Sequence, residues 1–378
     1  MLKPRKCLLD IREYHSPLGS AAKLRLDMNE NTTGCSPRVL AKLQSMDAKK
    51  LALYPPREPG EQVAAAYMGV GPANVILTNG ADEAIDLVCR GYLEPGDDVI
   101  IVPPTFAMYE VLAKAAGANV VRVPAGEDWV FPLEEVIQAV TPRTRIIFIT
   151  NPNNPTGVAI NRFNIVKIAA AAQDAAILVD EAYFEFCGQS MMDQVGKMKN
   201  VFVVRTFSKA FGMAGMRLGA LAGSIEHISV LRRMCPPFNV NTCVLECLKE
   251  AVMDRQFVAD YVKQVRETRD WTQQQLEELG FKCWPSHGNF VLCRLGDHKQ
   301  AILETLQDCG VSLRDRPDCP GCVRITIGTQ KEMEHVLYLL KEINTRIATA
   351  NDPAPENPPA GPEGEASPEA QAAHEIKP

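Results

Sequence analysis

The chain contains no apolar run near the ~20 residues that a helix needs to cross a bilayer. Its first residues, Met1-Leu2-Lys3-Pro4-Arg5-Lys6, lack the apolar core of a secretion signal. It also has no excess of positive charge, because 40 Lys and Arg stand against 46 Asp and Glu and give a net charge of -6. These absences argue against a membrane or nucleic-acid partner, and we expect a cytoplasmic protein.

Several motifs are missing as well. The sequence has neither a phosphate-binding Walker loop nor a Gly-x-Gly-x-x-Gly after a first strand, which argues against a nucleotide-binding enzyme. It has no N-terminal helix-turn-helix region of a DNA-binding regulator. The 12 cysteines are scattered, and Cys319-Pro320-Gly321-Cys322 has no second pair at zinc spacing. We therefore expect reduced core thiols and no metal site.

What the sequence does contain is an alternation of apolar runs and helical stretches between about residues 60 and 225. This pattern predicts an α/β fold with a mostly parallel seven-stranded sheet and helices on both faces. The last run follows Lys209 too closely for a crossover helix, so it could enter the sheet antiparallel. The seven runs are Val75–Leu77, Val99–Val102, Val120–Val123, Ile146–Ile149, Ile177–Val179, Val201–Val204 and Leu218–Ala222.

The remainder predicts a smaller α+β domain and a tail. Residues 1–33 form an arm with a short strand, Lys23–Asp27, that joins the small domain. Residues 34–240 form the large domain, and residues 241–350 form the small one after a helical region that spans Cys243–Leu279. Residues 351–378 are rich in Pro, Glu and Ala and lack aromatic residues, so we expect disorder there.

One lysine stands out by its position. Lys209 follows the apolar run Val201–Val204, with glycines at 212, 215 and 219 beyond it. A partly desolvated amine loses its proton easily and can attack a carbonyl as a Schiff-base nucleophile. Ser208 and Arg217 nearby suit a phosphate. An aldehyde and a phosphate together indicate pyridoxal phosphate.

Two other segments end strands in the same way. Asp180 closes the run Ala175–Val179, where an acid could pair with the pyridine nitrogen of that cofactor and keep it protonated. Asn154 lies in the Pro-rich loop after the run Ile146–Ile149 and could donate to the phenolic oxygen of the ring. Since the carboxyl ends of such strands meet at one edge of the sheet, we expect one shared site.

Further residues are candidates for binding the phosphate and the substrate. Gly80, Ala81 and Asp82 open a helix after Val75–Leu77, where free backbone N–H groups favour a phosphate. An ordinary turn capped by Asp82 is the alternative. Arg324 lies within an apolar strand and needs an anionic partner, because an unpaired charge there would be costly.

Taken in order, these segments resemble the fold-type I aminotransferases that depend on pyridoxal phosphate, and most closely the histidinol-phosphate aminotransferase branch. The resemblance runs from about Tyr14 to about Ile347. The residues that carry it are Leu26–Asn31, Tyr54-Pro55, Thr78–Glu83, Pro103–Tyr109, Asn151–Gly157, Asp180–Tyr183, Thr206–Gly219 and Gly321–Gly328.

The resemblance implies roles for residues that the patterns alone leave open. Tyr183 would bond the phenolic oxygen beside Asn154. Tyr109, favoured over Phe106, would stack on the pyridine ring. Tyr54 would reach the phosphate of the neighbouring subunit's cofactor, which implies a homodimer with shared active sites. The substrate-side positions are Arg324, Arg314, Tyr14 and Asn29; for Arg314 a salt bridge to Asp315 or Asp318 stays open.

The implied reaction is transamination between L-histidinol phosphate and 2-oxoglutarate in histidine biosynthesis, with Lys209 moving the proton. An aromatic amino-acid donor, or decarboxylation of threonine phosphate on the same fold, stays open. Phe106 and Phe238 stand where the branch often has Tyr, and each lacks a hydroxyl that could affect substrate preference.

Overall fold

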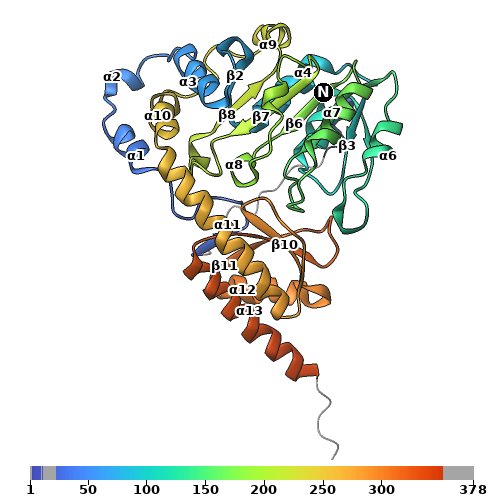
Figure 1. The fold of residues 1–378 in the computed structure, drawn as a ribbon, viewed down its shortest axis with the longest axis vertical. Coiled ribbons are helices and arrows are strands. Elements are labelled where there is room, and N and C mark those ends of the chain that lie inside the picture. Colours follow the sequence, from blue (N-terminus) through green and yellow to red (C-terminus); the bar gives the residue numbers. More distant parts are fainter. Residues whose placement is uncertain (1, 10, 12–22, 352–378) are drawn as a thin grey trace, which may run out of the picture.

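The fold is built on two β-sheets, a large one and a small one, linked by a long helix (Figure 1). The computed structural model describes residues 2–9, 11 and 23–351. Tyr14 and the predicted tail beyond residue 351 therefore lie outside the described residues.

The large sheet has seven strands in the order β2-β8-β7-β6-β5-β3-β4. Only β8 runs antiparallel to its neighbours, as the short connection after Lys209 allows. The predicted α/β fold with a mostly parallel sheet is confirmed. The strands are β2 (Val75–Asn79), β3 (Asp98–Ile101), β4 (Asn119–Arg122), β5 (Thr144–Thr150), β6 (Ala176–Asp180), β7 (Val201–Thr206) and β8 (Leu218–Ala222).

Both faces of this sheet are buried. Along β5, Ile146 and Phe148 pack into one apolar cluster while Ile147 and Ile149 pack into another, as the period of two in a strand requires. One face is covered by α4 (Gly80–Tyr92), α5 (Met108–Ala116) and α9 (Ile225–Arg232). The other is covered by α3 (Glu58–Met68), α6 (Leu133–Gln138), α7 (Arg162–Ala171), α8 (Phe184–Cys187) and α10 (Thr242–Met253).

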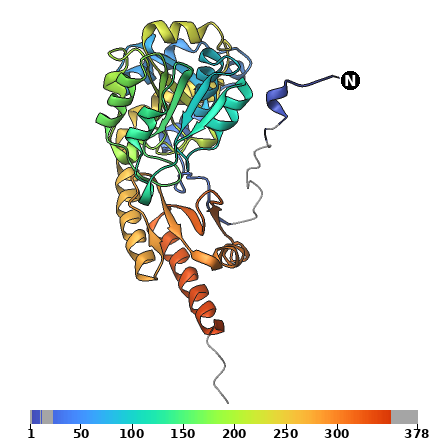
Figure 2. The ribbon, with the colours of Figure 1, turned by 90° about the vertical axis from the view of Figure 1, so that its right-hand side faces the viewer.

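The small sheet has five strands in the order β1-β11-β12-β10-β9. The N-terminal strand β1 pairs in parallel with β11, which draws the predicted arm into this sheet. The strands are β1 (Leu24–Leu26), β9 (Lys282–Cys283), β10 (Phe290–Arg294), β11 (Val311–Asp315) and β12 (Cys322–Thr326). Helices α12 (Lys299–Asp308) and α13 (Gln330–Asn351) accompany it below the large sheet (Figure 2).

The predicted helical region 243–279 is two helices rather than one. Helix α10 ends at Met253, and α11 (Arg255–Glu278) begins after Asp254, whose side chain accepts a hydrogen bond from the Phe257 backbone N–H. Helix α11 runs from the large sheet to the small one (Figure 1). We propose the domain boundary near residue 240, where the chain leaves the large sheet. Helices α1 (Pro37–Gln44) and α2 (Ala48–Leu51) complete the large part.

Strand β8 approaches the start of α4 closely, and this contact can be tested by mutation. A Cβ added at Gly219 would lie 2.5 Å from the carbonyl carbon of Gly80, a backbone atom that cannot move aside. We expect Gly219→Ala to cost about 1–3 kcal/mol of unfolding free energy, as overpacking does. The matched control is Gly215→Ala, because nothing lies within 4 Å of a Cβ there. Thermal unfolding should show a lower melting temperature only for Gly219→Ala; equal melting temperatures would contradict this packing.

Candidate active site

The amine of Lys209 lies at the centre of the site. Lys209 follows β7, and its Nζ donates a hydrogen bond of 2.9 Å to the carbonyl of Met28 from the N-terminal segment. Burial, together with the positive charges of Arg324 and Arg217, lowers the pKa of Lys209 to about 8, although the carboxylates of Glu30 and Asp82 act in the opposite direction. A sizeable fraction of this amine is therefore neutral near pH 7–8, the form that attacks a carbonyl or accepts a proton.

Asp180 occupies the last position of β6 and is only 4% exposed. Its Oδ2 accepts a 2.7 Å hydrogen bond from the Tyr109 hydroxyl, and its Oδ1 accepts one of 3.0 Å from the Ala182 backbone N–H. Burial raises the pKa of Asp180 to about 6, although both hydrogen bonds favour the carboxylate. A cationic partner would hold this carboxylate ionised more firmly.

Tyr109 packs into the core and bonds Asp180. It is fully buried, its ring lies face to face with Phe148 at 4.6 Å, and its hydroxyl bonds Asp180 and Thr150. Packing on Phe148 covers one face of its ring, and stacking of Tyr109 on the cofactor stays a prediction. Phe106 is half-buried and meets Tyr109 edge-on at 5.5 Å. The sequence could not separate them, because both aromatic residues follow the same strand.

Asn154, Tyr183 and Arg324 come together between the two sheets. The Oδ1 of Asn154 accepts a 2.6 Å hydrogen bond from Nη1 of Arg324, which lies in the middle of β12 and is 5% exposed. The other Arg324 nitrogen, Nη2, donates to the Asp27 carbonyl at 2.5 Å. Because Asn154 uses its oxygen in this contact, its amide N–H groups can donate to another partner. The positive charge of Arg324 also acts on the Tyr183 hydroxyl and opposes the rise of its pKa on burial.

The residues predicted to bind the phosphate come from three separate segments. Asn79 makes no side-chain cap at the start of α4, so the first N–H groups there have no cap from that side chain. Arg217 binds Asp82 with 3.1 Å between Nη2 and Oδ2, and a Cβ added at Gly80 would lie 2.4 Å from the same nitrogen. Ser208 accepts from the Thr206 hydroxyl at 2.9 Å, which leaves its own proton to donate.

Asn29 is placed differently from the expected substrate mouth. It is 1% exposed, has a backbone φ of 53°, and its side-chain amide donates to the Tyr183 hydroxyl at 2.9 Å. Tyr54 lies at the surface, 79% exposed, and stacks on Phe238 at 4.5 Å. Arg314 of β11 lies directly opposite Arg324 in the small sheet. Its suggested partners Asp315 and Asp318 pair with Lys299 and Arg316.

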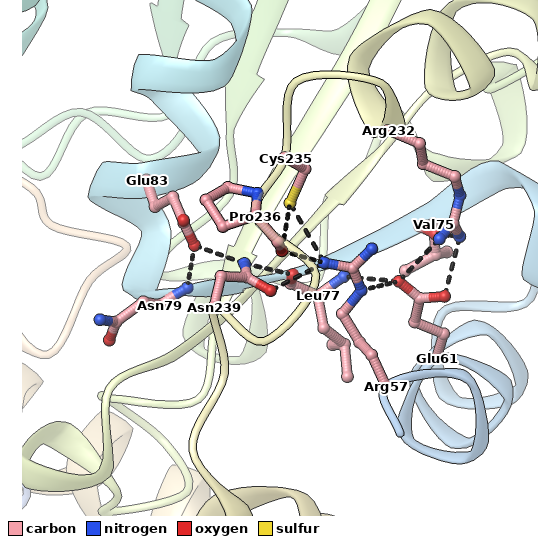
Figure 3. Close-up of polar contacts among 10 residues, drawn as sticks. All are labelled: Arg57, Glu61, Val75, Leu77, Asn79, Glu83, Arg232, Cys235, Pro236 and Asn239. Atoms are coloured by element: carbon pink, nitrogen blue, oxygen red, sulfur yellow. Dashed lines mark hydrogen bonds and ion pairs between the residues drawn. The ribbon is translucent and has the colours of Figure 1, made fainter. Parts of the chain in front are cut away.

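A polar network links Arg57 to Glu83 and Asn79 at the start of α4 (Figure 3). Arg57, three residues after Tyr54, donates to the Pro236 carbonyl and to Asn239 Oδ1, on either side of Phe238. Asn239 then donates to Glu83, which accepts from the Asn79 backbone N–H just before α4. The loop that carries Phe238 is therefore fixed to the start of α4.

Some contacts of the site had no signal in the sequence. The Asp27 and Met28 carbonyls bind Arg324 and Lys209 through backbone atoms, which any residue type supplies. Thr326 was detectable, because it lies two residues after Arg324 on one strand and so on the same face.

The residues fit pyridoxal phosphate. They supply a depressed-pKa amine, a buried carboxylate at a strand end, an amide donor and a phosphate cradle that a Gly80 side chain would fill. Within the described ranges, no three His, Cys, Asp or Glu side chains gather as a metal site would require. Nor does any helix among those residues combine the length and apolar character that membrane spanning needs.

Comparisons with known proteins agree with this chemistry. The histidinol-phosphate aminotransferase of Roseiflexus castenholzii is 36% identical over 335 residues, 85% of this chain and 89% of that protein. That of Dehalococcoides mccartyi is 32% identical over 326 residues, 85% of this chain and 90% of that protein.

A solved structure shares the fold. The histidinol-phosphate aminotransferase of Sinorhizobium meliloti, solved in complex with pyridoxal-5'-phosphate, superimposes with a TM-score of 0.80 at 24% identity over 86% of this chain and 92% of that one. The family described as aminotransferase class I and II matches residues 21–340. This chain therefore belongs to the aminotransferase class I and II family and is an aminotransferase with pyridoxal phosphate as its cofactor.

Proposed function

We propose that the protein transfers the amino group of L-histidinol phosphate to 2-oxoglutarate, as a cytoplasmic enzyme of histidine biosynthesis. The observation that supports an anionic substrate is the pair Arg324 and Arg314, directly opposite each other on β12 and β11. Like charges facing each other across strands are unfavourable, and a phosphate or carboxylate between them would offset that cost. The names of the two relatives, histidinol-phosphate aminotransferase, support the same donor.

The bound cofactor supplies an electron sink that stabilises negative charge at the substrate carbon. We assign the remaining tasks to residues of this chain. Asp180 holds a cation at the ring nitrogen, with Tyr109 fixing its carboxylate from behind. Asn154 and Tyr183 donate to the ring oxygen, and Tyr109 stacks on the ring. Gly80, Ala81, Asp82, Ser208 and Arg217 form the phosphate cradle.

Lys209 both holds the cofactor and moves the proton. Once the substrate amine has displaced it from the cofactor, its neutral amine would accept the proton from the substrate carbon as a general base and give that proton back as a general acid. The carbonyl of Met28, 2.9 Å from Nζ, orients the amine while it is not bonded to the cofactor. The positive charge of Arg324 lowers the pKa of Lys209, so a larger fraction of the amine is unprotonated near neutral pH.

The Lys209 assignment predicts a defined pH dependence. Since the pKa of the Lys209 amine is about 8, the neutral fraction of that amine increases up to about pH 8. The rate at which pyridoxal phosphate attaches covalently to the cofactor-free protein should therefore rise with pH and level off above about pH 8. Lys209→Ala should abolish both attachment and turnover. The control Lys199→Ala removes a lysine that is 73% exposed and should change neither. Borohydride reduction followed by peptide mapping would refute the assignment if it marked another lysine.

A homodimer with shared sites predicts complementation between inactive chains. Tyr54 and Phe238 form an exposed aromatic pair tied to the cradle, as a partner-facing surface would be. Lys209→Ala chains mixed with Tyr54→Ala chains should recover roughly a quarter of the normal activity, because half of the dimers would hold one intact site. Tyr54→Phe keeps the stacking on Phe238 and removes only the hydroxyl, so it tests the contribution of that hydroxyl. Absence of recovery after verified subunit exchange would rule out a shared site.

If Arg324 binds the anion of each substrate, its removal should lower kcat/KM both in the half-reaction with histidinol phosphate and in the half-reaction with glutamate. Removing a buried charge-assisted contact costs about 2–4 kcal/mol, so Arg324→Ala should lower kcat/KM about 30- to 1,000-fold for histidinol phosphate and for glutamate. Arg294→Ala, an exposed arginine on the neighbouring strand β10, is the control.

A panel of donors tests the choice of substrate separately. Histidinol without its phosphate should be a poor donor, because the arginine pair would lack its anion. A higher kcat/KM for phenylalanine or tyrosine than for histidinol phosphate would overturn the proposed donor and leave the aminotransferase assignment intact.

A further inference from the structure

Three consecutive residues after β1 each hold one side chain of the site. The Asp27 carbonyl accepts from Arg324, the Met28 carbonyl accepts from Lys209, and the Asn29 side chain donates to Tyr183. This short segment, residues 27–29, comes from the N-terminal arm, while its three partners come from β12, the loop after β7 and the loop after β6.

The side-chain amide of Asn29 has its oxygen toward Thr326 and its NH₂ group toward Tyr183. The Asn29 backbone N–H donates to Thr326 Oγ1 at 2.9 Å, and Thr326 Oγ1 in turn donates to Asn29 Oδ1 at 3.1 Å. The Thr326 hydroxyl thus bridges the backbone N–H and the side-chain oxygen of Asn29, and the NH₂ group of that side chain points to Tyr183. Thr326 is fully buried, so water cannot replace this relay easily.

The backbone of Asn29 is also unusual. Its φ of 53° lies in the left-handed region, which a non-glycine residue adopts at a cost. The Asn29 carbonyl accepts a 3.1 Å hydrogen bond from the Asn289 side chain, which helps to hold that conformation. Asn is the residue that tolerates this region best after Gly, and it alone adds an amide.

The direction of the bond to Tyr183 has a chemical consequence. The Asn29 amide occupies an acceptor position of the phenolic oxygen, so the phenol's own proton is left to be donated elsewhere. Burial raises the pKa of Tyr183, so the phenol keeps this proton at neutral pH. The charged groups that act on it are Arg324 of β12, Arg316 after β11 and Asp180 of β6.

We propose that Asn29 is a positioning residue, which fixes Tyr183 as a hydrogen-bond donor to the ring oxygen of the cofactor and does not bind the substrate itself. The inference rests on the proposed role of Tyr183 and is independent of which amino donor the enzyme uses. The Asn29 side chain is buried and already bonds Tyr183 through its NH₂ group and Thr326 through its oxygen.

The test uses the complete enzyme with bound pyridoxal phosphate and compares Asn29→Asp with Asn29→Gly. A carboxylate at position 29 has the shape of the amide but can only accept, so it would draw the Tyr183 proton away from the cofactor. Gly tolerates the left-handed backbone and removes the donor without reversing it. The readout is the pH titration of the cofactor's visible absorption, together with the dissociation constant of the cofactor.

Asn29→Asp should raise the apparent pKa of the visible band by about one to two pH units, in the same direction as Tyr183→Phe. The double variant should show no shift beyond that of Tyr183→Phe, because both act through one hydroxyl. Asn29→Gly should give a smaller shift in the same direction. Thr326→Val releases the amide while keeping the shape, and it carries the test if Asn29→Asp does not retain the cofactor.

An unchanged titration in Asn29→Asp and Thr326→Val, with only a lower melting temperature, would show that Asn29 is merely structural. A normal titration combined with a raised KM for the amino donor would restore a substrate-binding role and overturn the proposal. If the unmutated protein itself showed no visible band, the cofactor assignment would fail instead, so the two failures are distinguishable.

Discussion

The parallel arrangement of β5, β6 and β7 is the constraint on which the site depends. Parallel strands place their carboxyl ends along one edge of a sheet, and there the chain leaves the hydrogen-bonded ladder and can turn its side chains toward a ligand. Asn154, Asp180 and Lys209 follow these three strands in turn. The apolar faces on both sides of the sheet fix the strands, so the spacing of the three groups is set by the core.

Burial at this edge shapes the charges. Desolvation lowers the pKa of Lys209 to about 8 and raises that of Asp180 to about 6, which moves both groups toward neutrality in the absence of a partner. Arg324 and Arg217 bring positive charge close to Lys209, partly offset by Glu30 and Asp82, in a chain whose net charge is -6. The cationic character is local and belongs to the site, which suits a cofactor and substrate that each carry a phosphate.

The sequence predicted the fold and the acidic, basic and amide groups of the site because each has a distinct local signal. Lys209, Asp180 and Asn154 follow apolar runs, and Arg324 interrupts one. The sequence does not distinguish residues whose placement depends on packing. Tyr109 and Phe106 are both aromatic residues after β3, and only the stacking of Tyr109 on Phe148 separates them. The break at Asp254 was missed because the helical pattern continues across it.

Backbone contacts set a further limit to what the sequence could reveal, and they also couple the two sheets. Residues 27–29 follow β1, which pairs with β11, so they move with the small sheet. Arg324 belongs to that sheet too, whereas Lys209 and Tyr183 follow strands of the large one. A displacement of one sheet against the other would therefore preserve the bond from Arg324 to Asp27. The same displacement would stretch both the bond from Lys209 to Met28 and the bond from Asn29 to Tyr183. The positions of the Lys209 amine and the Tyr183 phenol therefore both depend on where the small sheet lies, although the two residues follow different strands of the large sheet.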